Sequence, residues 1–310
     1  ELRNEIFNHA IESFKLEVFK DYDWHFDMLQ LAFINSTNQN HYDVLYKILN
    51  ESGFDHYQLE RAIDLKYKII LKTKRDKESQ EFLQDNISFP NIRNKAIEIA
   101  FNSKEFGKAK AYAYDGIEQH TKENAPGLVD TWKDWLLKIA IEENETQSII
   151  ELAKFLLISR KISNQDYYKI LKRYVPIDEW ESFFSELISD IKSNGFDSFY
   201  IIGNLLIREG KWSDLFEHIS ENPTLDVLKS YEKHLKGDYA VELAEMYAKG
   251  ILKYIENNYG KTNYQIACGY ILRIYNLKQK DIAEDLIEEL KTKFSKRRAL
   301  REELRKIKQI

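Results

Sequence analysis

Acidic side chains and a histidine gather near the start of the chain, where the sequence reads DYDWHFD. The group comprises Asp21, Asp23, His25 and Asp27. Carboxylates and imidazoles are common metal ligands, but the glycine and the twelfth-position glutamate of a calcium loop are missing at the required offsets. Aspartate is also a preferred N-cap. We therefore interpret Asp23 as the cap of a helix that carries Trp24, and we expect no metal site and no cofactor.

Residues suited to catalysis are scattered along the chain. Six further histidines stand singly: His9, His41, His56, His120, His218 and His234. No HExxH motif occurs, and no glycine-rich loop follows a strand. Because catalytic triads are recognised by their geometry and not by their order in the chain, a site assembled between helices stays open as an alternative. The sequence favours a protein that is not an enzyme.

The single cysteine, Cys268, lies in the apolar run YQIACGYILRIY. One cysteine excludes an internal disulfide framework and every zinc site that needs several cysteines. We expect a buried thiol with a structural role. No run of about 18 apolar residues is present, which predicts the absence of a transmembrane helix and agrees with a cytoplasmic location.

The most charged stretch reads KFSKRRALREELRKI near the end of the chain. Residues 291–308 hold nine basic side chains against two glutamates, a net charge of +7, although the whole chain has a formal charge of −5. On a helix, Leu300, Leu304 and Ile307 share one apolar seam. The seam predicts a terminal helix that docks on the preceding helices.

Five basic residues follow this seam and are the candidates for binding a partner: Arg297, Arg298, Arg301, Arg305 and Lys308. The favoured interpretation is a solvated helix that caps the fold. A contact with another protein or a second copy is an alternative, and nucleic acid is another, because clustered basic residues neutralise phosphates. The acidic remainder of the chain would oppose binding to DNA.

The elements that position these residues are predicted to be helices throughout. Apolar residues recur at three- and four-residue spacing, and strict alternation is absent. The chain has only 11 glycines and 4 prolines in 310 residues, which favours long helices with short connections. Asp55 is expected to cap a helix, and prolines 176 and 223 are expected in first turns. Residues 124–127 are expected to form a loop. We predict sixteen or seventeen helices.

Four segments share a large apolar anchor, with apolar residues three and seven positions later. The anchors are Phe106, Ile149, Trp180 and Trp212. Of these, Phe106, Trp180 and Trp212 are expected to be largely buried. Their spacings approach those of tetratricopeptide, HEAT and armadillo repeats. Because one helix pair cannot bury its own apolar face, neighbouring pairs must stack. The predicted fold is all-α, an irregular α-solenoid of stacked antiparallel helix pairs.

Residues 80–310 resemble the C-terminal helical region of bacterial SWIM zinc-finger family proteins. The resemblance rests on the order of several segments, above all YAVELAEMYAKGILKYIENNYGKTNYQIACGYILRIYNL and the closing ELKTKFSKRRALREEL. In that family the zinc ligands lie upstream, in a Cys-x-Cys and Cys-x-His pattern that this sequence lacks. The resemblance therefore implies a helical region beside a module that binds DNA or protein, and no zinc ligand in this chain.

These observations predict a non-enzymatic helical-repeat interaction module that engages a protein partner. The alternative is an accessory domain that binds nucleic acid through basic helices. We expect an N-terminal helical segment at residues 1–88 and a helical-repeat domain at residues 89–310, or one continuous solenoid. The chain begins with Glu1 and not with methionine, which leads us to expect a fragment of a longer protein.

Overall fold

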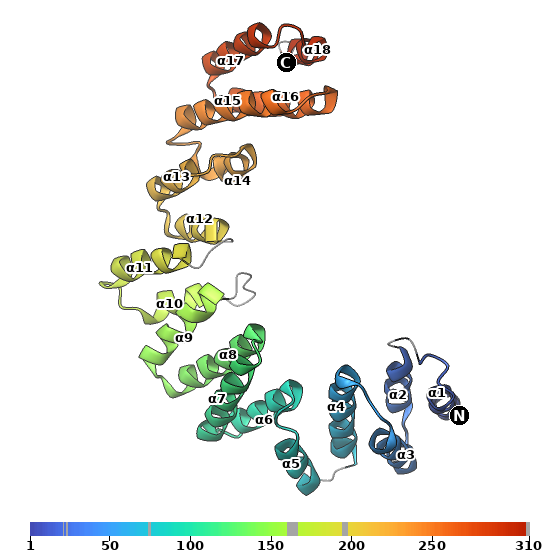
Figure 1. Cartoon of the computed structure of the whole chain (residues 1–310). Helices are drawn as coiled ribbons and strands as arrows, with labels where there is room; N and C mark the ends of the chain where they lie inside the picture. Colours follow the sequence, from blue (N-terminus) through green and yellow to red (C-terminus); the bar gives the residue numbers. More distant parts are fainter. Residues whose placement is uncertain (21, 23, 74–75, 160–166, 194–197, 308–310) are drawn as a thin grey trace. The chain divides into compact units, whose positions relative to one another are not determined.

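The computed structural model describes residues 1–310 except 21, 23, 74–75, 160–166, 194–197 and 308–310. Eighteen α-helices, one or two more than expected, and no strand occur in the described part of the chain (Figure 1). The predicted all-α fold class is therefore confirmed. None of the described helices combines the length and the apolar character needed to cross a lipid bilayer.

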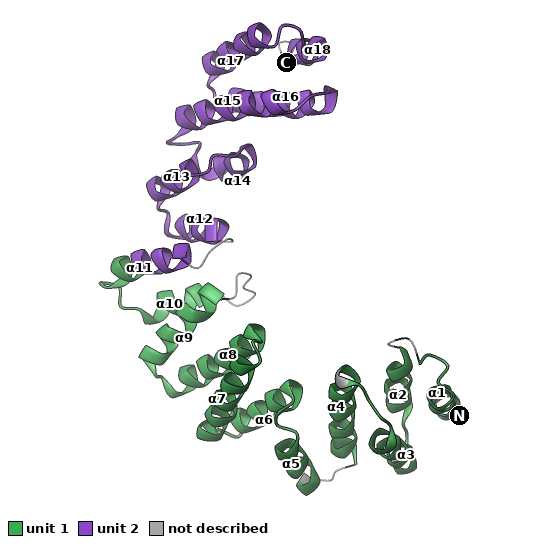
Figure 2. Ribbon diagram, in the orientation of Figure 1, with its two compact units in different colours: residues 1–183 green, residues 184–310 purple. Residues whose placement is uncertain are grey.

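The chain divides into two compact units, residues 1–183 and residues 184–310 (Figure 2). The boundary expected at residues 88 and 89 lies inside the first unit. The helices of unit 1 are α1 (Leu2–Lys15), α2 (Trp24–Asn35), α3 (Gln39–Glu51), α4 (His56–Lys72), α5 (Asp76–Asp85), α6 (Pro90–Asn102), α7 (Phe106–Lys122), α8 (Pro126–Glu143), α9 (Thr146–Ser159) and α10 (Tyr167–Tyr174).

The boundary between the units falls within α11 (Trp180–Ser193). The remaining helices of unit 2 are α12 (Ser198–Glu209), α13 (Trp212–Ser220), α14 (Leu225–Leu235), α15 (Ala240–Asn257), α16 (Lys261–Asn276), α17 (Lys280–Lys293) and α18 (Arg298–Ile307).

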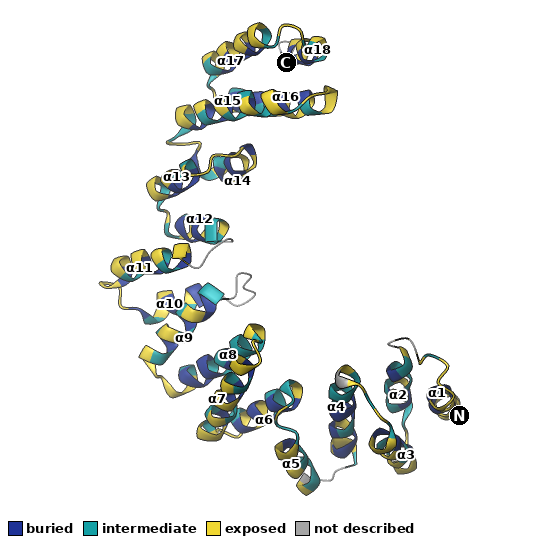
Figure 3. Ribbon diagram, in the orientation of Figure 1, coloured by how far each residue is buried: buried dark blue, intermediate teal, exposed yellow. Residues whose placement is uncertain are grey.

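Helices pack mainly on their neighbours in the chain. Within unit 1, α6 contacts α7, α7 contacts α8 and α8 contacts α9, while α6 also reaches α8. Within unit 2, α15 contacts α16 and α17, and α16 contacts α17 and α18. Buried residues lie on the sides where helices meet, and exposed residues cover the remaining faces (Figure 3). One core cluster of unit 1, for example, surrounds Trp132 between α6, α7 and α8.

A backbone turn that leads directly into the next helix recurs five times in the described part of the chain. Its central residue has a left-handed φ of 54–66° and is Lys104, Asn124, Asn144, Gly210 or Lys278. The next residue donates its N–H to the carbonyl five positions earlier, at 2.8–3.2 Å, and the following residue starts a helix. This is the Schellman arrangement, which satisfies carbonyls that the ending helix leaves free. The first three turns are spaced by 20 residues.

These turns correct the predicted alignment of anchors. Five residues after the left-handed residue comes a fully buried side chain in four of the five cases, namely Ala109, Ile149, Leu215 and Ala283. Ile149 therefore corresponds to Ala109 and Leu215, whereas the sequence analysis aligned it with Phe106 and Trp212, three positions too early.

The four anchors differ in how far they are buried. Trp180 is buried, as expected, and Ile149 is buried as well. Phe106 and Trp212 are only half-buried, although Trp180, which also begins its helix, is buried. The expectation that Phe106 and Trp212 are largely buried is therefore wrong, because both side chains are partly exposed.

Candidate partner-binding groove

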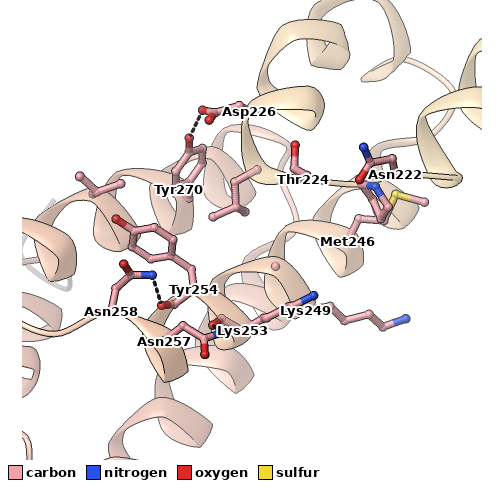
Figure 4. A pocket seen from close by; sticks show the side chains of 14 residues that line it. Asn222, Thr224, Asp226, Met246, Lys249, Lys253, Tyr254, Asn257, Asn258 and Tyr270 are labelled. Carbon is pink, nitrogen blue, oxygen red and sulfur yellow. Dashed lines mark hydrogen bonds between the residues drawn. The ribbon is translucent and has the colours of Figure 1, made fainter. Parts of the chain in front are cut away.

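A groove of about 880 Å³ lies between α14, α15 and α16 in unit 2 (Figure 4). One face of α15 forms most of it, because its lining residues recur at three- and four-residue spacing. From α15 and its C-terminal cap come Met246, Lys249, Gly250, Lys253, Tyr254, Asn257 and Asn258. The start of α14 contributes residues 222–226, and α16 contributes Ile266 and Tyr270.

A glycine allows α14 and α15 to approach closely at the groove. A Cβ atom at Gly250 would lie 2.8 Å from Cδ2 of Leu225, a distance that real side chains do not adopt. Leu225 is the first residue of α14 and is buried. Thr224 caps this helix, since its Oγ1 accepts the N–H of Val227 at 3.3 Å. The cap and the glycine together fix where the end of α14 meets α15.

Hydrogen bonds hold the three helices together at both ends of the groove. The Tyr270 hydroxyl donates to Oδ1 of Asp226 at 2.8 Å and joins α16 to α14 (Figure 4). The Tyr254 hydroxyl donates to Oδ1 of Asn263 at 3.0 Å and joins α15 to α16. Burial, and then the hydrogen bond to Asp226, raise the pKa of Tyr270 to about 12, so its hydroxyl remains a donor at neutral pH.

A second polar network joins the same three helices. Oε2 of Glu232 on α14 accepts the Tyr247 hydroxyl of α15 at 2.8 Å and Nη1 of Arg273 of α16 at 3.1 Å. Burial, and then the bond to Glu232, raise the pKa of Tyr247 well above its usual value. A carboxylate shared by two donors satisfies charge that would be costly to bury alone. The groove therefore has fixed walls.

The groove combines apolar and cationic side chains. Leu225, Met246 and Ile266 provide the apolar contribution. Lys249 and Lys253 are exposed, and neither takes part in an ion pair among the described residues. The single acid in the lining, Asp226, accepts from Tyr270. Such a surface can bind an apolar side chain and an anionic group next to each other.

The groove is a shallow, elongated surface feature. Many of its lining residues are exposed, namely Asn222, Pro223, Lys249, Lys253 and Ile266. A typical small-molecule site is more enclosed and buries most of its ligand. From Met246 to Asn257, α15 rises by about 17 Å at 1.5 Å per residue. This length corresponds to about three turns of a second helix.

The predicted basic residues at the end of the chain have different surroundings. Arg297 is half-buried: its guanidinium donates to the carbonyl of Ile255 and lies 4.1 Å from the ring centre of Tyr259 and 4.4 Å from that of Phe294. Arg298 donates to Glu302 at 2.9 Å. Arg301 and Arg305 are exposed on α18, and Lys308 lies outside the described residues.

The apolar seam of this last helix is buried, as predicted. Leu300 and Leu304 are fully buried and Ile307 is nearly so, and α18 packs on α16. Lys306, outside this seam, pairs with the buried Glu303 at 2.7 Å. The structure therefore does not bring the five candidate residues together as one free cationic surface, because Arg297 is used to attach the end of α15.

The acidic stretch near the start of the chain lies only partly in the described region. Asp21 and Asp23 are outside it, so the expected cap cannot be located. His25 stacks on Phe14 at 4.4 Å between ring centres, and Asp27 forms an ion pair with Arg61. Among the described residues, no group of three or more histidine, cysteine or acidic side chains could hold a metal ion.

Cys268 is buried, as expected, and burial raises the pKa of its thiol to about 11. A thiol with a raised pKa is a poor nucleophile at neutral pH because little thiolate is present. This agrees with a packing role for the side chain in α16.

The sequence analysis missed the groove residues. Lys249 and Lys253 lie on α15 four residues apart, a spacing that any solvated helix face shows. A signal was present in Gly250, since a glycine inside a helix has an intrinsic cost and often marks a close approach. Comparison with protein-family models, curated proteins and solved structures found no match to this chain.

Proposed function

We propose that the chain is a non-enzymatic interaction module that binds a segment of a partner protein in the groove between α14, α15 and α16. The observation that supports this proposal most directly is the groove itself, where apolar side chains lie next to two lysines that form no ion pair with any described residue. Its length suits an amphipathic helix, which typically lays its apolar face into such a groove.

The proposal includes a helical-repeat architecture, an irregular α-solenoid of antiparallel helix pairs. Two observations support it: packing between each helix and the next one or two, and the recurrence of one turn geometry. A 20-residue interval between turns corresponds to about 40 residues per helix pair, in the range of HEAT and armadillo repeats. Solenoids commonly use their extended surfaces to bind partners.

The proposed biological setting follows from the sequence resemblance. A C-terminal helical region of a SWIM zinc-finger-like bacterial protein would work in the cytoplasm, beside a module that binds DNA or protein. A direct role in binding nucleic acid has less support, because Arg297, Arg298 and Lys306 form contacts within the chain. A protein partner is therefore the preferred ligand.

The test begins with selecting 16-residue peptides that bind this chain from a random display library. Ile266→Arg should weaken the binding of selected peptides by about tenfold or more, because it places a long charged side chain on an apolar part of the groove. Val241→Arg is the matched control. Val241 and Ile266 are similarly exposed, at 47% and 44%, but Val241 does not line the groove.

Circular dichroism should show that both variants keep the helical fold. Equal binding by the two variants would show that the groove is not the binding site. Failure to select any peptide would count against the proposed function as a whole.

A further inference from the structure

The charges in the groove indicate what kind of segment it binds. Lys249 and Lys253 lie one helical turn apart on α15, which places their Cα atoms about 6 Å apart along the helix axis. Some other lysines of this unit have acidic partners within the chain, such as Lys293 with Glu256 and Lys306 with Glu303, whereas Lys249 and Lys253 have none among the described residues. The two groove lysines are therefore available to an external anion.

The acid in the groove does not neutralise Lys249 and Lys253. Asp226 lies on α14 and accepts the Tyr270 hydroxyl, an interaction that keeps its Oδ1 directed to α16 (Figure 4). The lining residues carry two positive charges against this one negative charge, although the chain has a net charge of −5. The groove is thus locally basic on an acidic protein.

The apolar side chains set the second requirement. Met246 lies one turn before Lys249 on the same face of α15, and Ile266 of α16 is 44% exposed. An occupant must cover these side chains while it presents anions to the lysines. Two acidic side chains four residues apart on a helix match the spacing of Lys249 and Lys253.

We infer that the groove binds an acidic amphipathic helix of a partner protein. Its acidic side chains, one turn apart, face Lys249 and Lys253, and its apolar side chains pack on Met246, Leu225 and Ile266. The inference rests on the proposed function and adds the sign and the spacing of the charges that the partner carries.

The groove also extends beyond Tyr270. A smaller hollow of about 250 Å³ shares Ile266 and Tyr270 with it and is bordered by Lys229 and Arg273. Arg273 is held by Glu232, whereas Lys229 is exposed. A helix longer than three turns would therefore meet a further cation on this side.

The experiment uses two fluorescein-labelled 16-residue helical peptides with the same apolar face. One carries glutamates and the other lysines at the same two positions, four residues apart. Fluorescence anisotropy with the full chain should show about tenfold tighter binding of the glutamate peptide at low salt, and a smaller preference at high salt, because ions screen exposed charges.

Charge reversal provides the decisive variant. Lys249→Glu with Lys253→Glu should invert the preference in favour of the lysine peptide. Lys233→Glu with Lys236→Glu is the matched control, since both residues are exposed on or next to α14, lie outside the groove and change the net charge equally. This control should leave the preference for the glutamate peptide in place.

The outcomes separate the inference from the proposed function. If the lysine peptide binds as tightly as the glutamate peptide and Ile266→Arg weakens both, the groove binds peptides but the inferred chemistry is wrong. If neither designed peptide binds while library peptides do, the inference is again wrong. If library peptides fail as well, both proposals are wrong.

Nucleic acid is the remaining occupant to test. A labelled single-stranded oligonucleotide should show no binding that depends on the groove lysines. Binding that is lost in the Lys249→Glu and Lys253→Glu variant would overturn the inference, because the anions recognised would then be phosphates.

Discussion

Glycines inside helices show where two helices of this protein lie closest together. Cβ atoms at Gly116, Gly203 and Gly250 would each come within 3 Å of a neighbouring side chain. At Gly203 of α12 the neighbour is the aromatic ring of Tyr231 on α14. A ring held in a buried position cannot move aside as the end of a flexible side chain can.

Gly203→Ala should therefore destabilise the protein by about 1–3 kcal/mol, the usual cost of overpacking a core. The new methyl group would clash with the hydroxyl oxygen of Tyr231 and with its Cζ, which would lie 2.7 Å away. Thermal unfolding followed by circular dichroism measures the effect.

Gly269→Ala is the control. Gly269 lies inside α16, and no atom would come within 4 Å of its added Cβ. Alanine has the higher helix propensity, so this change should leave stability unchanged or raise it by up to about 1 kcal/mol. Equal melting temperatures for the two variants would contradict the close approach at Gly203.

The role of a single residue could be predicted where it depends on residues nearby in the sequence. Asp55 caps α4 as expected, and its Oδ1 accepts the N–H of Gln58 at 2.7 Å. Arg297 was expected on an accessible band, but its contacts with Ile255 and Tyr259 come from α15 and its C-terminal connection, about 40 residues earlier. Helical periodicity places a side chain on a face and contains no information about which distant segment covers that face.

At the scale of helices and turns, the left-handed turn is the feature that repeats. Gly210 occupies it without strain, whereas Lys104 and Lys278 have a Cβ in a conformation that costs an ordinary residue about 1 kcal/mol or more. The backbone hydrogen bonds of the turn compensate for this cost.

Lys278→Gly should stabilise the protein by about 0.5–1 kcal/mol, because glycine adopts a positive φ freely. Gly210→Ala makes the opposite change, because it adds a Cβ at a left-handed residue. It should destabilise the protein by about 1 kcal/mol or more. Chemical denaturation of both variants measures the two effects. A Gly210→Ala variant as stable as the parent chain would show that residue 210 does not hold the left-handed conformation.

Sequence patterns predicted the existence of helices better than their starts. Pro126 was expected in a loop but begins α8, whereas Pro176 and Pro223 were expected in first turns but precede α11 and α14. At α14 the nearby Thr224 provides the cap instead. The left-handed turns were missed as a repeat because lysine, asparagine and glycine all occupy the same backbone position, and only their dihedral angles reveal the similarity.

At the scale of the whole molecule, helices contact mainly their neighbours in the chain, so local damage should stay local. Trp132→Ala removes a fully buried side chain from the cluster of α6, α7 and α8, and such truncations cost about 3–5 kcal/mol. Hydrogen exchange should accelerate in these three helices and stay unchanged in α14, α15 and α16.

Hydrogen–deuterium exchange with mass spectrometry measures both regions in one sample. Gly107→Ala is a suitable control, because it changes the same part of the chain but places a methyl group where no atom lies within 4 Å. Uniformly faster exchange over all helices of the Trp132→Ala variant would show one cooperative folding unit and contradict the expectation.

The 20-residue interval between Lys104, Asn124 and Asn144 also limits how this chain can change length during evolution. One residue inserted into α7 or α8 would rotate everything after it by about 100° and turn the buried face away from the neighbouring helix. An insertion of seven residues, which adds two helical turns, would return the buried face to its neighbour. It would also lengthen one helix by about 10 Å relative to its partner. Duplication or loss of a whole helix pair preserves both the face and the turn, so length variation among descendants of this chain should come in steps of about 40 residues.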